Sequence, residues 1–448
     1  MASTYLTRSK SSPTSDKIGT ISFWMKKSSI AAEQCIIQSG GGTIDSNIFF
    51  DTSSRLNVYD YQSGAYQFRY VTNRVFRDPS AWSHIVVRID TTDATAADRV
   101  KIYVNGVQET SFNTSTNPSQ NLTPLFFTNT YNFWVGSYRS TGSFFDGSLS
   151  HFHYTDGYAY DASTFGSTDS VTGEWKINTS PSITMGTNGF TILKDGNTIT
   201  DQSSNSNDFT LGGGTLTKTE DNPSNNFATL NVLDTPFPGQ VATFSNGATT
   251  GAGTETGFLA GASSIGVSSG KYYAEFKVTG GNTSFHVFGV LKSPVDTLGS
   301  TAPHDSTRFY GVRGVGTKIQ PGGGGGETAS WAGTWTTNDI ISLALDCDNN
   351  RLYVAKNGQY ADGSGNYNQA FTGTPAYITL ASNEIYHLMG ASISTGSGVS
   401  LTMQANFGNG YFGTQQISSE GTNASGIGKF ENDVPANFTA LCTSGLNE

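Results

Sequence analysis

The sequence has little charge, and its basic residues do not cluster. Only 13% of the 448 residues are Asp, Glu, Lys or Arg, about half of what globular proteins usually carry. The 25 Lys and Arg residues are outnumbered by 35 Asp and Glu, which gives a net charge of -10. Because binding to a nucleic-acid backbone needs clustered positive charge, we expect no nucleic-acid partner. The same reasoning disfavours an anionic membrane surface.

Cysteine is scarce, and long apolar runs are missing. The three cysteines, Cys35, Cys347 and Cys442, are far apart and show no Cys-x-x-Cys spacing. This pattern predicts buried free thiols, and neither a disulfide framework nor a zinc site. No run approaches the roughly 18 apolar residues of a membrane span, so we expect no membrane insertion. The opening MASTYLTRSK lacks the apolar segment of a signal peptide, which predicts synthesis and assembly in a cytoplasm.

Helical periodicity is also absent, apart from one short turn that would fit DASTFG (161–166). Apolar and polar residues alternate instead: ISFWMK places Ile21, Phe23 and Met25 on one face, and KYYAEFKV (271–278) alternates in the same way. Clusters rich in Gly, Asn, Asp, Ser and Pro separate such segments at about ten-residue spacing, as in antiparallel sandwiches. The sequence therefore predicts an all-β protein.

Strand-like segments thin out between about 176 and 240, where the chain is polar and rich in glycine. The length is about three times that of a common domain, which favours two domains. We predict two antiparallel β-sandwich domains of jelly-roll type in tandem. The first spans 1–215, a connector spans 216–240, and the second spans 241–448 with a C-terminal tail.

Two hairpin segments echo each other without implying a repeat. RVKIYVNG ends at Asn105-Gly106, and RLYVAKNG ends at Asn357-Gly358. An Asn-Gly pair favours the tight turn between two antiparallel strands, because both residues tolerate a positive φ. Shared turn chemistry therefore explains the likeness, and we predict a hairpin turn at each place.

The order of the motifs carries two family resemblances. In the first half, ISFWMK is followed by AWSHIVVRID (81–90), RVKIYVNGV (99–107) and FWVGSYRSTGSFFDG (133–147). This order resembles the laminin-G-like, concanavalin-A-like jelly roll. In the second half, KYYAEFKV, NDIISLALDCDNNRLYVAKNG (338–358) and ANFGNGYF (405–412) resemble the SPRY domain, a bent β-sandwich. Both resemblances imply binding modules.

Two further stretches resemble virion proteins of tailed phages, especially marine ones: the polar run from TNGFTILKDG (187–196) to NPSNNFATLN (222–231), and the ending PANFTALCTSGLNE (435–448). This resemblance implies a virion location, capsid or tail proteins as partners, and a homo-oligomer. The chain has no coiled-coil heptads or collagen-like repeats, and Met1 leads almost directly into the first predicted sandwich. We therefore expect a compact appendage, with capsid decoration and a tail or fibre-tip position both open.

The chain shows no pattern of catalytic residues. Glucanases on this fold carry Glu-x-Asp-x-(x)-Glu on one strand, and here Asp90 and Asp93 fall in a loop. GVSSG (266–270) has the spacing of a nucleophile elbow but lacks the helix after it. His151 and His153 share a strand face without a third metal ligand nearby. We predict no enzyme and no cofactor; a calcium ion held by unidentified loop residues, a glucanase-like depolymerase and a free lectin stay open as alternatives.

Aromatic side chains are the candidate ligand-binding residues, because sugar rings stack on Trp and Tyr while amides and carboxylates bond their hydroxyls. With a host-surface glycan as the expected ligand, the candidates are Tyr131, Trp134, Tyr138 and Tyr154 in the first domain and Trp331 and Trp335 in the second.

Overall fold

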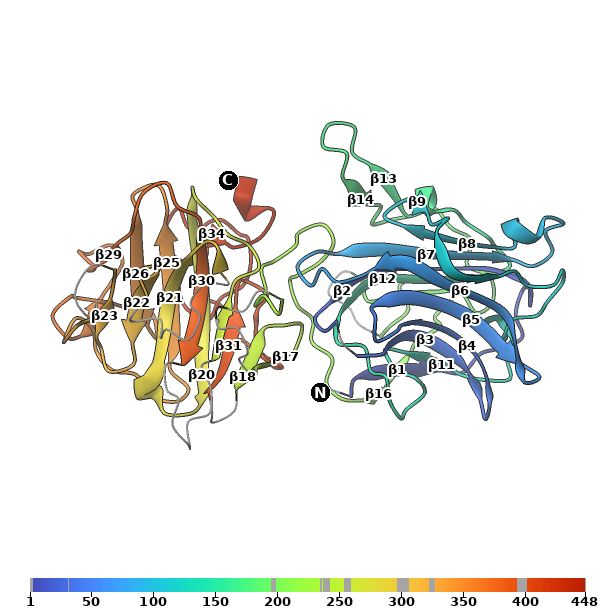
Figure 1. Ribbon diagram of the computed structural model, residues 1–448, viewed down its shortest axis with the longest axis horizontal. Helices are drawn as coiled ribbons and strands as arrows, with labels where there is room; N and C mark the ends of the chain where they lie inside the picture. Colours follow the sequence, from blue (N-terminus) through green and yellow to red (C-terminus); the bar gives the residue numbers. More distant parts are fainter. Residues whose placement is uncertain are drawn as a thin grey trace. The chain divides into compact units, whose positions relative to one another are not determined.

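Strands form the regular structure of this protein, as the alternating patterns predict (Figure 1). The computed structural model describes residues 3–30, 32–194, 199–233, 236, 242–253, 259–295, 306–321, 327–392 and 401–447. The chain divides into two compact units, residues 1–218 with 222–224 and residues 219–221 with 225–448. Among the described residues the helical segments are short 3-10 turns, namely η1 (Ala96–Asp98), η2 (Leu125–Phe127), η3 (Ala162–Thr164), η4 (Thr283–Phe285) and η7 (Gly445–Asn447).

Two antiparallel sheets form the first unit (Figure 1). The eight-stranded sheet runs in the order β10 (Phe112–Thr116), β6 (Ala65–Val75), β5 (Arg55–Gln62), β4 (Ile44–Phe50), β3 (Gln34–Gly41), β11 (Phe133–Val135), β1 (Tyr5–Arg8) and β16 (Thr210–Gly213). The six-stranded sheet runs in the order β15 (Phe190–Ile192), β12 (Gly147–Asp156), β2 (Ile18–Lys27), β7 (Ser83–Asp90), β8 (Val100–Val104) and β9 (Val107–Gln108). A separate hairpin joins β13 (Gly166–Thr168) to β14 (Trp175–Ile177).

The core of the first unit lies between these sheets and follows the predicted alternation. Ile21, Phe23 and Met25 are all buried there. From the eight-stranded sheet, Ile37, Ile48 and Val58 stand in register and meet them. Burial of such apolar side chains is the main favourable contribution to the free energy of folding. The turn predicted at DASTFG is η3, and its Ala162 and Phe165 pack against Val86 on the outer side of the six-stranded sheet.

The second unit is also a sandwich. Its larger sheet has the main order β17 (Ala242–Ser245), β18 (Thr250–Gly253), β31 (Leu401–Asn406), β20 (Lys271–Gly280), β25 (Ile340–Asp346), β26 (Arg351–Lys356), β27 (Gln359–Ala361) and β28 (Tyr367–Gln369), with β29 (Ile378–Thr379) beside β26 and β34 (Thr439–Ala440) parallel to β20. The six-stranded sheet has the order β19 (Leu259–Ala262), β30 (Tyr386–Ser392), β21 (His286–Lys292), β22 (Phe309–Arg313), β23 (Lys318–Ile319) and β24 (Glu327–Thr328), and β32 (Tyr411–Phe412) pairs with β33 (Gln415–Gln416).

Both faces of the larger sheet in the second unit are covered. The side chains of Phe276, Leu343 and Val354 point to the core between the sheets. On the opposite face, Tyr273 packs under Phe430, Val434 and Phe438. These three residues belong to the stretch 418–442, which we call the C-terminal segment. A strand covered on both faces buries consecutive residues, as Tyr272, Tyr273 and Ala274 of β20 show. The C-terminal segment is thus a third layer of this unit.

The predicted connector, 216–240, needs a correction. Phe227, Ala228 and Leu230 are buried in the cores of the second unit. The Ala228 N–H donates a backbone hydrogen bond of 2.9 Å to the carbonyl of Leu441. The second unit therefore begins near residue 225, because the short apolar stretch FATL, set in a polar run, belongs to its core. Residues 234, 235 and 237–241 lie outside the described residues.

The cysteine prediction is confirmed: Cys35, Cys347 and Cys442 are all free and buried. Within the described part of the chain, no helix is long and apolar enough to cross a membrane.

The two Asn-Gly turns are also confirmed. Asn105 and Gly106 join β8 to β9 with φ of 47° and 79°, and Asn357 and Gly358 join β26 to β27 with φ of 49° and 81°. These are the two positive φ angles of a hairpin turn whose twist matches that of its strands.

The surroundings of the two glycines differ, which gives a first prediction. A Cβ on Gly106 would lie 2.3 Å from the Trp175 ring, whereas one on Gly358 would lie 3.2 Å from Oδ1 of Asn432. Both alanine variants suffer the strain of a positive φ, roughly 1–2 kcal/mol. Gly106→Ala must also displace an indole, so we expect it to cost about 1–3 kcal/mol more than Gly358→Ala. Chemical denaturation of each variant checks this, and equal losses would contradict it.

Candidate functional site

The outer face of the eight-stranded sheet in the first unit carries a continuous row of polar and aromatic side chains. The row is set by strand register: Trp134 lies opposite Gln38, Gln38 opposite Asn47, and Asn47 opposite Tyr59. Residues directly opposite in antiparallel strands point to the same side. At one end Thr7 pairs with Trp134, and at the other Arg69 pairs with Tyr59. We call this set of six residues the polar row.

The polar row faces away from the core. The adjacent register row, Val135, Ile37, Ile48, Val58 and Tyr70, belongs to the core of the first unit. Since successive residues of a strand point to opposite sides, the polar row lies on the outer face. Within it Gln38 and Asn47 are covered, at 0% and 3% exposed, whereas the other four residues are half-buried.

In the middle of this face a buried hydrogen-bonded group surrounds Asp45. The Tyr59 hydroxyl donates to Oδ2 of Asp45 at 2.7 Å, and the Asn47 amide reaches the same hydroxyl at 3.5 Å. Asp45 is 5% exposed, and burial raises the pKa of its carboxyl, opposed by the Tyr59 hydroxyl and by Arg139. Burial and Asp45 together raise the pKa of Tyr59. The group therefore offers a carboxyl and a phenol in a partly dehydrated setting.

Aromatic rings continue from Tyr59 across β4, β5 and β6. The Tyr59 ring makes edge contacts with Phe49 at 5.8 Å and with Tyr66 at 5.4 Å between centroids, and Tyr66 meets Tyr61 at 5.0 Å. The Arg69 guanidinium lies 4.6 Å from the centroid of the Tyr66 ring. Tyr66 is 45% exposed. Rings in edge contact hold one another in place, so this part of the face is preorganised for a flat ligand.

Two of the six predicted ligand-binding residues, Trp134 and Tyr138, lie at this face. Trp134 is in the polar row. The Tyr131 ring packs instead against Gly41 at the end of β3, where a Cβ would lie 2.5 Å from it and would point to the side opposite Gln38. Tyr138 is close enough to Asp45 for that carboxylate to raise the pKa of its phenol, although burial is the larger cause. All three side chains are half-buried.

Arg139, next to Tyr138, adds unsatisfied donors to the face. Its guanidinium lies 5.1 Å from the centroid of the Tyr138 ring. Within the described part of the chain, its Nε and Nη2 atoms are buried and have no hydrogen-bond partner. A buried donor without a partner costs free energy. A ligand acceptor that bonded these two atoms would remove that cost, and so would add more binding free energy than an acceptor on an open, hydrated surface.

The other three predicted residues belong to the cores instead. Tyr154 is 0% exposed and donates to the carbonyl of Phe126, and Trp331 and Trp335 are 6% and 2% exposed. A ring enclosed by protein cannot offer its face to a sugar, so these three predictions are corrected to packing roles. Alternation along one strand cannot tell an inward ring from an outward one when both faces are covered.

Sequence reasoning missed Gln38, Asp45, Asn47 and Tyr59. Each lies at a strand position that alternates with buried apolar residues such as Ile37, Ile48 and Val58. That signal marks an outward face, but only the strand order shows that the four residues adjoin.

The outer face of the other sheet of this unit is covered. Segment 158–183 lies over His84 and His153, whose rings lie 6.3 Å and 5.4 Å from that of Phe165, and His84, His151 and His153 are 1%, 6% and 3% exposed. Trp175 donates its indole N–H to Nδ1 of His84 at 3.1 Å and stacks parallel to that ring. The histidines that the sequence placed on a sheet face are thus packing residues under this covering segment.

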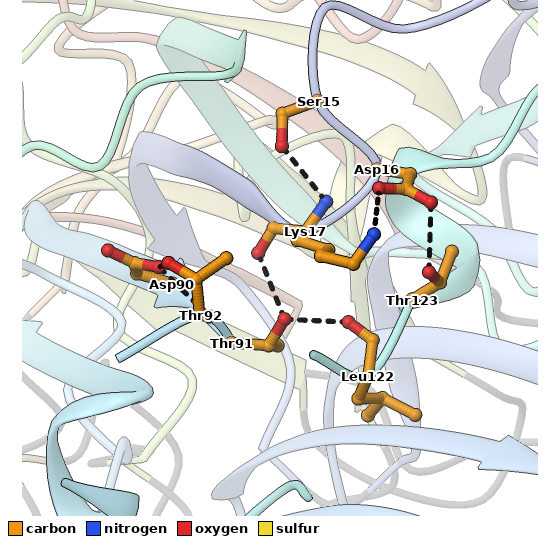
Figure 2. Close-up of polar contacts among 8 residues, drawn as sticks. All are labelled: Ser15, Asp16, Lys17, Asp90, Thr91, Thr92, Leu122 and Thr123. Atoms are coloured by element: carbon orange, nitrogen blue, oxygen red, sulfur yellow. Dashed lines mark hydrogen bonds and ion pairs between the residues drawn. The ribbon is translucent and has the colours of Figure 1, made fainter. Parts of the chain in front are cut away.

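Carboxylates at the rim of the first unit are engaged by protein groups (Figure 2). Asp16 lies in a loop, whereas Asp90 ends β7 and does not lie in a loop as the sequence suggested. Asp16 accepts from Lys17 at 2.7 Å and from Thr123 at 3.0 Å, and Asp90 accepts from the hydroxyl of Thr92 at 2.6 Å. Among the described residues no group of three His, Cys, Asp or Glu is arranged to hold a metal ion. These side chains lock the rim loops to one another.

Comparisons with known proteins bear on the first unit. No curated protein matches this chain in sequence. Solved structures with some likeness are the SPRY domain of human HERC1 (19% identity, 37% of this chain and 92% of that chain, TM-score 0.29), a heptameric SAP-like pentraxin from Limulus polyphemus (14%, 38% and 77%, 0.28) and domains LG4-5 of the mouse laminin alpha1 chain (8%, 96% and 92%, 0.29). Residues 2–160 match the family model of the concanavalin A-like lectin/glucanases superfamily, so the first sandwich has the concanavalin-A-like, laminin-G-like fold that its motifs predicted.

Proposed function

We propose that this is a non-enzymatic binding protein whose first unit binds carbohydrate on the outer face of its eight-stranded sheet. The polar row carries the proposal. It combines hydrogen-bonding groups, among them the half-buried Thr7 and Arg69, with the flat rings of Trp134 and Tyr59, and a sugar presents the same combination of hydroxyls and apolar faces. Its position on a concanavalin-A-like sandwich, a fold class whose family model includes lectins, supports this choice.

The charges of the face favour a saccharide with acidic groups. Arg69 and Arg139 supply guanidinium donors at its two sides, whereas Asp45 is held by Tyr59. Guanidinium groups pair well with carboxylates. An acidic surface polysaccharide therefore fits better than a basic ligand.

Replacing Trp134 by alanine is expected to weaken glycan binding by at least about tenfold. This is the change in affinity that corresponds to the loss of one stacking contact between a ring and a sugar. A glycan array with the full chain identifies the ligand, and calorimetry with that glycan gives the affinity of each variant. Tyr377→Ala, which removes a ring 41% exposed in the second unit, is the matched control. Binding that is unchanged in Trp134→Ala, or equally weakened in the control, would contradict the proposed site. We expect EDTA to leave binding unchanged, because no cofactor or calcium ion is part of the proposal.

For the place of action, we propose the particle of a tailed phage, as a homo-oligomeric appendage on the capsid or tail that touches other virion proteins and a host-surface glycan. The support is the resemblance of the run 187–231 and of the C-terminal stretch to such proteins. Mass spectrometry of purified particles and immunoelectron microscopy test this. Absence from every particle, together with glycan binding, would identify a free lectin instead.

A glucanase-like depolymerase is the second candidate, favoured by Asp45, whose raised pKa suits a general acid. It predicts release of reducing ends from the bound glycan, and loss of that release in Asp45→Asn. Binding without any release, at neutral pH and at pH 5, supports the non-enzymatic proposal.

A further inference from the structure

The second unit has a pocket beside its C-terminal segment that the proposed function does not use. Its volume is about 470 Å³, within the range of roughly 300–1,000 Å³ that is usual for small-molecule sites. One wall is the start of β20 with Lys271 and Tyr272, a second is the β25–β26 turn with Asp348, and the third is the C-terminal segment with Asn437 and Thr439.

Thr439, whose hydroxyl is unsatisfied, is one of the residues that line this pocket. Thr439 is 5% exposed, and its Oγ1 is buried without a hydrogen-bond partner among the described residues. A buried hydroxyl with no partner costs free energy, which a ligand oxygen in the pocket would recover. Thr439 is held in place by its pairing with Tyr272, since β34 runs parallel to β20 at that point. The hydroxyl is therefore rigidly presented.

The remaining lining mixes donors and acceptors. Lys271 is paired with Asp346 at 3.3 Å, so it adds a donor without a free positive charge. One oxygen of Asp348 accepts from the backbone N–H of Gly270 at 2.7 Å. Asn437 supplies an exposed amide at a positive φ of 67°. A phosphate would be repelled by the Asp348 carboxylate. An aliphatic ligand would leave the polar groups of the pocket without hydrogen-bond partners.

We propose that this pocket binds a small neutral polyol, a single sugar or the end unit of a glycan, independently of the first unit. Each sugar hydroxyl both donates and accepts, which matches a lining in which donors and acceptors alternate. The site is formed only when the C-terminal segment is docked, because Asn437, Phe438 and Thr439 all come from it. The ligand thereby also stabilises the docking of that segment.

The test uses the full chain in a Trp134→Ala background, so that sugar held by the first unit is not counted. Saturation-transfer NMR and calorimetry with glucose, galactose, mannose, rhamnose and N-acetylglucosamine are the binding measurements. We expect at least one sugar to bind, and Thr439→Val to weaken it roughly five- to tenfold, as for one lost hydrogen bond. Valine keeps the shape of threonine, so the melting temperature should stay equal or rise.

Thr374→Val, at an exposed threonine outside the pocket, is the matched control and should bind as the parent does. The proposal is overturned if none of the sugars binds at tens of millimolar, or if Thr439→Val binds as tightly as its parent. Binding that depends on Trp134 and not on Thr439 would also overturn it, while leaving the function proposed for the first unit intact.

Discussion

Glu275→Ala is expected to lower the free energy of unfolding of the second unit by roughly 3–5 kcal/mol. This glutamate on β20 is fully buried under the C-terminal segment. Its carboxylate accepts the backbone N–H groups of Glu431 at 2.9 Å and Asn432 at 2.8 Å, and the side-chain amides of Asn432 at 3.0 Å and Asn406 at 3.3 Å. Burial raises the pKa of Glu275 to about 7, opposed by these hydrogen bonds. Alanine would leave two backbone donors buried and unpaired.

In Glu275→Ala the C-terminal segment should lose stability before the rest of the second unit does. The C-terminal segment is held on β20 by this carboxylate as well as by its apolar contacts, so hydrogen exchange and proteolysis of residues 418–442 should speed up in Glu275→Ala. Chemical denaturation gives the total loss. Glu420→Ala, at an exposed glutamate of the same segment, is the matched control and should change stability by less than about 0.5 kcal/mol. Equal behaviour of the two variants would show that Glu275 does not anchor the segment.

The second large effect is a loss of stability of the first unit in acid. Burial, with help from neighbouring His151, lowers the pKa of His84 and of His153 to about 3. Unfolded histidine takes up its proton near pH 6.5. The folded pKa values are depressed below the unfolded one, so these neutral rings give full stability above about pH 6.5, and this stability is lost as the pH falls toward 3. Each histidine contributes a slope of about 1.4 kcal/mol per pH unit in that window.

The hydrogen bonds around the rings explain why they stay neutral. Nδ1 of His84 accepts the indole N–H of Trp175, so this ring carries its proton on Nε2, next to the Ser22 hydroxyl at 2.9 Å. A second proton on Nδ1 would oppose the indole N–H. His153 bonds the Thr191 hydroxyl through Nδ1 at 2.8 Å, with its ring closed off from water.

His153→Asn tests this linkage, because asparagine can still reach the Thr191 hydroxyl in place of Nδ1 but does not titrate. We expect the slope of unfolding free energy against pH between 6 and 4 to be smaller in the variant by about 1.4 kcal/mol per pH unit. Hydrogen exchange of the amides in β12 and β15, measured at increasing denaturant concentration, reports the unfolding of the first unit separately from that of the second. At pH 8 both proteins bind the same number of protons, so a difference there measures packing alone. Parallel slopes in acid would show that His153 does not titrate on unfolding.

The sequence by itself determined the local structure. Period-2 alternation placed Ile21, Phe23 and Met25 in a core, and the Asn-Gly pairs marked two hairpin turns. Both signals are local: the alternation follows from strand geometry and the turns from positive φ at two adjacent residues. The absence of helical periodicity likewise gave the all-β class.

Only the tertiary structure decided which surfaces are available for binding. Trp134 and Tyr154 lie in similar strand patterns, yet one stands half-buried on an outer face and the other lies between two sheets. The polar row joins residues far apart in the sequence, such as Thr7 and Trp134, because β11 inserts between β1 and β3. Likewise, the C-terminal segment covers Glu275 and forms the pocket at Thr439. Strand order and the covering of faces depend on long-range pairing, which alternation along one segment does not encode.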